Sequence, residues 1–160
     1  MRSIAEEFMK IEIPADEIKK KRASIASLFI EKSANVKSSY ITSISAYDLR
    51  ILYEIYDKVF LQDWFRRNYK GKMKFSLSGR MTKSAGKTIC PQNISSMEPE
   101  KVVLEIRIGI DFFLGRGHLA TGCNVCGLEA GSSLEALLLV FEHEICHALE
   151  ILLFGKSSCR

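Results

Sequence analysis

The amino-acid sequence predicts an α+β fold, with a small mixed or antiparallel sheet of about three strands packed on a C-terminal helix and on an upstream helix. Two observations lead to this prediction. Three short runs with strand character follow one another in the chain, and the long segments with helical character stand before and after them. Grouped strands and grouped helices are typical of α+β domains.

The first 40 residues are rich in lysine and carry spaced isoleucine, leucine and phenylalanine. We expect a helix over residues 15–31, because Pro14 stands at its start. For the basic run at 19–22, a solvated helix face is favoured over a contact with DNA. We interpret residues 1–40 as a basic helical extension and residues 41–160 as the main domain.

A capping box predicts where the upstream helix begins. Ser45 can accept a hydrogen bond from the amide of Asp48, while the carboxylate of Asp48 reaches back to the amide of Ser45. The helix should continue its apolar face into Trp64 and Phe65 before Gly71 ends the segment. The buried face is expected to hold Leu49, Leu52, Tyr53, Tyr56 and Phe60.

Three strands are predicted after this helix, over residues 73–78, 87–90 and 101–108. The third alternates most clearly, so we expect one buried face and one solvent-facing face. The glycine-rich residues 115–131 are expected to form a loop or an insertion. Ser132 and Glu135 then form a second capping box, and a strong helix should run to about Phe154, with Gly155 as its C-cap.

Composition limits the class of protein. The chain has 160 residues, of which 47% are apolar and 26% charged, as expected for one soluble domain. A net charge of +4 permits nucleic acid as a partner without requiring it. No apolar run is long enough for a membrane span, and no secretory signal is expected. Five scattered cysteines favour a reducing, cytoplasmic setting, and the sequence does not set the oligomeric state.

One motif carries recognisable chemistry. His143, Glu144 and His147 match the pattern H-E-x-x-H in the middle of the last predicted helix. Residues i and i+4 share one helix face, so the two imidazoles can converge on one Zn²⁺ ion. Glu144 lies about 100° around the helix, where it can act as a general base on a metal-activated water. This arrangement predicts hydrolysis of a peptide bond.

The competing interpretation is a core helix whose polar residues are satisfied locally. Against it, the chain has only three histidines, and two fall in the motif. The neighbours of the metal face are apolar, as a buried site requires: Ala136, Leu139 and Val140. Burying two histidines and a glutamate without partners would be costly.

A catalytic zinc ion usually has three protein ligands, and the motif supplies two. Glu150 shares their face but lies further along the axis, which favours a role as hydrogen-bond partner of His147. His118 in the glycine-rich stretch and Cys159 after the helix are the other candidates.

The remaining cysteines carry weaker signals. Cys123 and Cys126 form a lone CxxC, which we interpret as reduced loop cysteines, with metal binding as the alternative. Cys146 is expected to be a small core residue.

Three ordered segments resemble the SprT-like zinc metallopeptidases. Residues 77–86 resemble the family's S-x-R-M-T-x-x-A-G strand and turn, residues 53–60 its preceding helix, and residues 140–147 its active-site helix. The resemblance covers the chain from about residue 45. It implies a zincin-like domain, with His143 and His147 as ligands and Glu144 as the base. Family members include DNA-dependent proteases that degrade proteins crosslinked to DNA.

The chain departs from the family at the third ligand, a histidine downstream of the active-site helix. Residues after Gly155 contain no histidine. Three explanations stay open: the domain lacks its C-terminal end, another residue replaces the ligand, or the metal is held weakly.

Three functions are therefore compared. The first is an endopeptidase acting on protein substrates, including those bound to DNA. The second is an inactive metal-binding or DNA-binding module, whose contact surface would combine the N-terminal helix with Arg66, Arg67, Lys70, Lys72 and Lys74. The third is a small-molecule amidase. An open edge on the strand at 101–108 would favour a peptidase, because it could accept an extended peptide, and a covered edge would favour the amidase.

Overall fold

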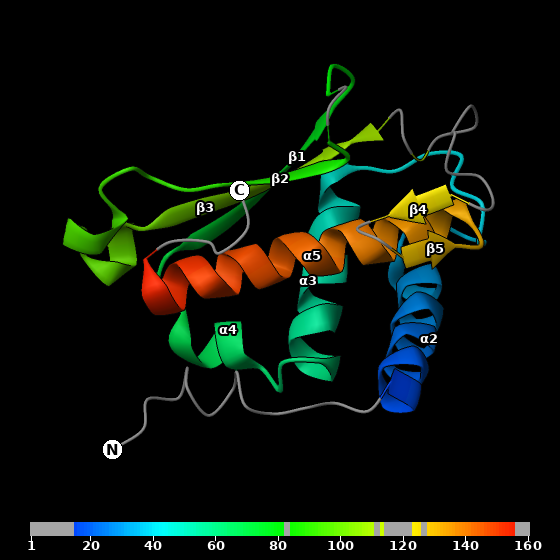
Figure 1. The fold of residues 1–160 in the computed structure, drawn as a ribbon, viewed down its shortest axis with the longest axis horizontal. Coiled ribbons are helices and arrows are strands. Elements are labelled where there is room, and N and C mark those ends of the chain that lie inside the picture. The colour runs from blue at the N-terminus through cyan, green and yellow to red at the C-terminus, as the bar shows by residue number, and fades with distance from the viewer. Residues whose placement is uncertain (1–14, 82–83, 111–112, 114–122, 126–127, 156–160) are drawn as a thin grey trace.

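A computed structural model describes residues 15–81, 84–110, 113, 123–125 and 128–155 of the chain. Helix α5 (Ser133–Phe154) crosses the middle of the molecule, with the sheet on one side and α2 (Ala15–Lys32) and α4 (Trp64–Asn68) on the other (Figure 1). Helix α3 (Ala46–Val59) runs across α5 and also packs against the sheet. The predicted α+β fold is confirmed. No helix in the described ranges is both long and apolar enough to cross a membrane.

The main sheet has three strands in the order β1-β3-β2. Strand β1 (Lys72–Ser78) runs parallel to the central strand β3 (Val103–Gly109), and β2 (Gly86–Ile89) runs antiparallel to it. The expectation of an edge on the strand at 101–108 is wrong, because β3 is paired on both sides. Both edges of β3 are covered by its neighbouring strands, as in any central strand. The state of these edges therefore does not discriminate between a peptidase and an amidase. The strand that ends the sheet next to α5 is β2.

Local sequence signals explain where the helices begin and end. Both hydrogen bonds of the predicted capping box between Ser45 and Asp48 are present at the start of α3. At α5, Ser132 accepts from the amide of Glu135, but the Glu135 carboxylate accepts from the amide of Gly131 rather than from the cap residue. Gly155 ends α5 with φ +76°, as predicted.

The core joins helices from both ends of the chain. Ile25 and Phe29 of α2 are fully buried, in one cluster with Tyr56 of α3 and Phe141 of α5. The described part of the predicted N-terminal extension therefore packs into the same core as the main domain. Within the basic run at 19–22, the two lysines at 19 and 20 are exposed, and the other two side chains are partly buried.

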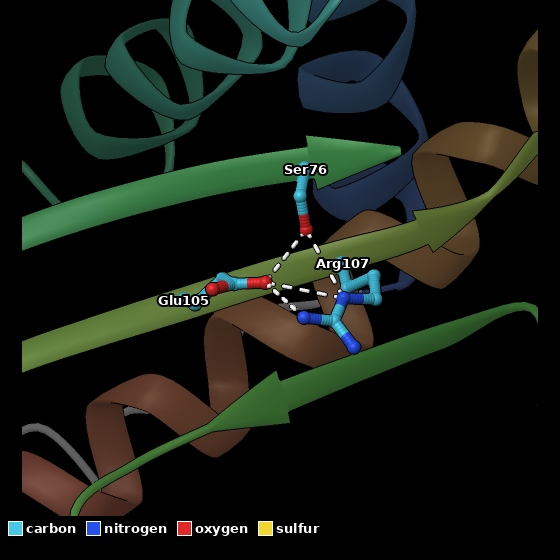
Figure 2. Close-up of polar contacts among 3 residues, drawn as sticks. All are labelled: Ser76, Glu105 and Arg107. Atoms are coloured by element: carbon cyan, nitrogen blue, oxygen red, sulfur yellow. Dashed lines mark hydrogen bonds and ion pairs between the residues drawn. The ribbon is translucent and has the colours of Figure 1, made fainter. Parts of the chain in front are cut away.

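Strand β3 shows the predicted alternation. Leu104, Ile106 and Ile108 are buried on one face. On the other face, Figure 2 shows the carboxylate of Glu105 accepting hydrogen bonds from Ser76 of β1, at 2.7 Å, and from Arg107. The Ser76 hydrogen bond, together with the positive charge of Arg107, holds the pKa of Glu105 below its ordinary value. This network ties β1 to β3 on the solvent side.

The glycine-rich stretch is not only a loop. Its described residues include a small antiparallel pair, β4 (Cys123–Val125) and β5 (Leu128–Ala130). Both strands lie against the N-terminal half of α5 (Figure 1). Two 3₁₀ turns, Ile94–Ser96 and Pro99–Lys101, lie in the segment between β2 and β3.

Candidate metal centre

Helix α5 brings the two predicted histidines together. The Nε2 atoms of His143 and His147 lie 2.8 Å apart, and their rings meet edge to face at an angle of 86°. The pairing follows from helical geometry, because side chains four residues apart lie one above the other on the same face. Both imidazoles therefore present the same nitrogen to one point in space.

Glu144 completes the group. Its side chain is only 5% exposed, and one carboxylate oxygen lies within 4.8 Å of a ring nitrogen of each histidine. Among the described residues, these are the three histidine, cysteine or acidic side chains close enough to share an ion. Two imidazoles suit a divalent cation, and a buried carboxylate beside them can either bind the ion or accept a proton from its water.

The donor atoms fit a zinc ion after a small adjustment. Two nitrogens bound tetrahedrally at about 2.0–2.1 Å from zinc would lie about 3.4 Å apart. The observed separation of 2.8 Å is shorter than this by about 0.6 Å, so one or both rings would have to rotate for the two nitrogens to share a zinc ion. The helix face around them is apolar: Ala136, Leu139 and Val140 are all buried, as predicted.

Strand β2 lies directly against this part of α5. The hydroxyl of Thr88 lies 2.9 Å from Oε1 of Glu144 and 3.0 Å from its backbone carbonyl oxygen. A Cβ atom added to Gly86 would lie 3.0 Å from Cγ of Glu144 and 2.7 Å from Val140. Gly86 therefore allows the strand to approach the helix, and Thr88 makes the polar contact.

No motif in the sequence marks Thr88 as part of the site. Gly86 and Thr88 are two positions apart, so in a strand their Cα–Cβ directions fall on one face. This spacing is the one feature of the sequence that could have indicated that Gly86 and Thr88 face the same neighbour. It did not reveal that this face meets Glu144, because strand pairing and helix packing are not local properties.

Of the three candidates for a third metal ligand, only Glu150 lies among the described residues. The carboxylate of Glu150 lies 3.9 Å from Nδ1 of His147, which is not the nitrogen that faces His143. Glu150 therefore lies beside His147 on the side away from His143, at a distance that suits an ion pair but is too long for a hydrogen bond. His118 and Cys159 lie outside the described residues.

Of the predictions made for the cysteines, one is wrong and one is not tested by the described residues. Cys146 was expected in the core but is exposed. The backbone of Cys123 lies in β4. Cys126 lies outside the described residues, so the CxxC interpretation stays a prediction.

Helix α5 is also held on the side away from the sheet. The guanidinium of Arg22 forms two hydrogen bonds with the carboxylate of Glu142, at 2.8 and 3.3 Å. The hydroxyl of Tyr56 donates to the backbone oxygen of Leu138 at 3.0 Å. Burial raises the pKa of Tyr56 well above its ordinary value, so this hydroxyl stays protonated as a donor.

A scan against known protein families, a search of curated proteins and a search of solved structures each found no significant match. The chemistry of the group therefore follows from its own donor atoms and surroundings. Those are two imidazoles on one helix face, a buried carboxylate between them in sequence, and a strand hydroxyl bonded to that carboxylate.

Proposed function

We propose that the chain is a zinc-dependent endopeptidase, related to the SprT-like metallopeptidases and zincin-like in its fold. The observation that carries this proposal is the facing pair of Nε2 atoms on His143 and His147, with the buried carboxylate of Glu144 beside them. The three segments that resemble the family fall in α3, in β1 and the turn to β2, and in α5. The scattered cysteines of the sequence support a reducing, cytoplasmic setting as part of this proposal.

Each residue has a distinct chemical role. His143 and His147 would hold the metal through their Nε2 atoms. Zinc, when bound, supplies Lewis acidity and lowers the pKa of a water molecule towards neutrality. The carboxylate of Glu144 accepts the proton as water attacks the peptide carbonyl, and passes it to the leaving amine. Glu150 orients the ring of His147 from the Nδ1 side.

The decisive experiment combines metal content with cleavage. The purified protein should contain about one zinc ion per chain and should cleave an unfolded or DNA-bound protein. Glu144→Gln should keep the zinc and lose at least about 100-fold in kcat, because it removes only the proton acceptor. His143→Ala and His147→Ala should lose both metal and cleavage.

A matched control comes from the same helix. Glu142→Gln changes the preceding carboxylate, which pairs with Arg22 and not with the histidines. It should retain zinc and cleavage in the folded fraction. If Glu144→Gln cleaves as well as the unchanged protein while holding zinc, Glu144 is not the base and the peptidase proposal is wrong.

A second candidate is a DNA-binding module with an inactive site. Five basic side chains on α4, on β1 and in the short segment between them are all exposed, which supports a contact with phosphates: Arg66, Arg67, Lys70, Lys72 and Lys74. The same surface would serve a peptidase that acts on DNA-bound protein. The two candidates differ in cleavage and not in DNA binding.

The DNA contact has its own test. Affinity for double-stranded DNA should fall steeply between about 50 and 200 mM salt, since each phosphate contact releases a counterion. Substituting Arg66, Lys70 and Lys74 by glutamine should reduce that slope. Glutamine at the exposed lysine at position 19 of α2 tests whether the N-terminal helix belongs to the same surface. An affinity independent of salt would exclude this contact.

A further inference from the structure

Strand β2 is the element of the sheet that touches the candidate metal centre. Its residue Thr88 is half-buried and pairs with Ile106 of the central strand, so its backbone is fixed by the sheet. Its hydroxyl donates to Glu144, with Oε1 at 2.9 Å and the backbone oxygen at 3.0 Å. A single hydroxyl proton is shared between these two acceptors.

The carboxylate of Glu144 needs such a contact to keep one orientation. A glutamate side chain has three rotatable torsions, and the last is broad. Threonine is branched at Cβ, so few rotamers are open to Thr88. A stiff side chain on a paired strand can therefore hold a flexible one. Gly86 lies beside Cγ and Oε2 of the same carboxylate, and a side chain there would displace it.

We propose that Thr88 is a positioning residue for Glu144. Its hydroxyl holds Oε1 and keeps the carboxylate in the orientation that it needs beside His143 and His147. This inference rests on the proposed peptidase function, since it assigns Thr88 an effect through the general base. It adds a residue on a separate element, 56 positions away from Glu144.

A purely structural role is the competing explanation. The same hydroxyl also reaches the backbone oxygen of Glu144, so it could simply fasten β2 to α5. The two roles differ in what they change. A fastening bond affects stability and leaves the orientation of the carboxylate to other contacts. A positioning bond affects the rotamer of Glu144 and the rate of the chemical step.

The kinetic test uses three variants of the full chain. Thr88→Val replaces the hydroxyl by a methyl group of similar size, and kcat should fall about 10–100-fold with KM within about twofold. Thr88→Ser restores a hydroxyl, and kcat should return to within about threefold of the unchanged protein. Thr88→Ala is the fallback if the valine variant does not fold. Zinc content should stay the same in all three.

A structural readout makes the test independent of cleavage. A crystal structure of the unchanged protein should show Glu144 in one rotamer. A crystal structure of the valine or alanine variant should show Glu144 in a different rotamer or in several rotamers. The serine variant should restore the first rotamer. An unchanged Glu144 rotamer in the variants without the hydroxyl overturns the proposal, as does an unchanged kcat.

The two proposals can fail separately. If the unchanged protein binds zinc but cleaves nothing, the peptidase function is wrong, and the rotamer comparison still decides whether Thr88 holds Glu144. If the protein cleaves and the Glu144→Gln variant does not, but Thr88→Val leaves both kcat and rotamer unchanged, the failure belongs to Thr88 alone.

The chain offers a matched control. Ser76 of β1 also donates its hydroxyl to a glutamate, Glu105, at 2.7 Å, but on the solvent side of the sheet (Figure 2). Ser76→Ala removes a comparable hydrogen bond from the same sheet. It should leave kcat, KM and the rotamer of Glu144 unchanged. A rate loss equal to that of Thr88→Val would show that any loosening of the sheet has the same effect, and would overturn the assignment of Thr88.

Discussion

Arg22 of α2 lies 2.8 Å from the carboxylate of Glu142, the residue immediately before His143. The two residues are 120 positions apart in the chain, and both side chains are about three-quarters buried or more. Burial disfavours the charged guanidinium, but the hydrogen bond and negative charge of Glu142 outweigh it and raise the pKa of Arg22. The pair therefore anchors the N-terminal helix to the helix that carries the candidate metal centre.

The first prediction concerns this pair. Arg22→Ala should lower the free energy of unfolding by about 1–3 kcal/mol, because Glu142 keeps a partly buried charge without its main partner. Urea unfolding of Arg22→Ala, of Glu142→Gln and of the double variant measures the coupling energy between the two side chains. The double variant should be less destabilised than the sum of the two. Additive losses would mean that the pair makes no net contribution.

The second prediction tests whether the N-terminal helix is a separate extension. Phe29 is fully buried in the common core, so Phe29→Ala should destabilise the protein by about 3–5 kcal/mol. Ser27→Ala, at an exposed position of the same helix, should stay within about 0.5 kcal/mol. Thermal unfolding monitored by circular dichroism distinguishes them. Equal stability of the two variants would support a detachable extension at residues 1–40.

The sequence predicted the local features of this fold, because their causes are local. The capping box of Ser45 and Asp48 depends on a spacing of three residues, and the facing of His143 and His147 on a spacing of four. The alternation along the strand at 101–108 correctly separated its buried and solvent-facing sides.

The features that the sequence did not reveal depend on pairing between distant segments. The alternation of β3 is the same for a central and an edge strand of a half-buried sheet, so it did not show that β3 is central. Thr88 meets Glu144, and Arg22 meets Glu142, only after the sheet and helices have packed. No spacing within a single element predicts those contacts.

The third prediction is a pH dependence of stability. Burial by itself raises the pKa of Asp48, but hydrogen bonds from Ser33, Asn35 and Ser45 outweigh it and bring the pKa below its ordinary value. A carboxyl whose pKa is lower in the folded state contributes stability that is complete above its unfolded pKa of about 3.9. That contribution is lost as the pH falls through the folded pKa.

Asp48→Asn should therefore cost about 1–3 kcal/mol at pH 7, and the difference from the unchanged protein should shrink as the pH falls below about 4. Unfolding free energies measured from pH 3 to pH 7 check both parts. A difference that is constant over this range would show that the charge of Asp48 has no part in its contribution, and that only the shape of the side chain matters.

The last prediction uses two glycines, Gly79 just after β1 and Gly86 at the start of β2. A Cβ atom at Gly86 would lie 2.7 Å from Cγ1 of Val140 and 3.0 Å from Cγ of Glu144, whereas one at Gly79 would meet nothing within 4 Å. Neither glycine has a positive φ, so alanine is compatible with both backbones. Gly86→Ala should cost about 1–3 kcal/mol by overpacking. Gly79→Ala should be close to neutral. Both substitutions reduce the conformational entropy of the unfolded chain by a similar amount.

The comparison isolates the contact between β2 and α5, since the effect on the unfolded state cancels. Gly86→Ala should also lower kcat by displacing the carboxylate of Glu144, while Gly79→Ala should not. If the two alanine variants unfold at the same urea concentration, β2 does not lie against α5 as closely as this structure has it. That outcome would also contradict the hydrogen bond from Thr88 to Glu144, because it depends on the same approach of strand to helix.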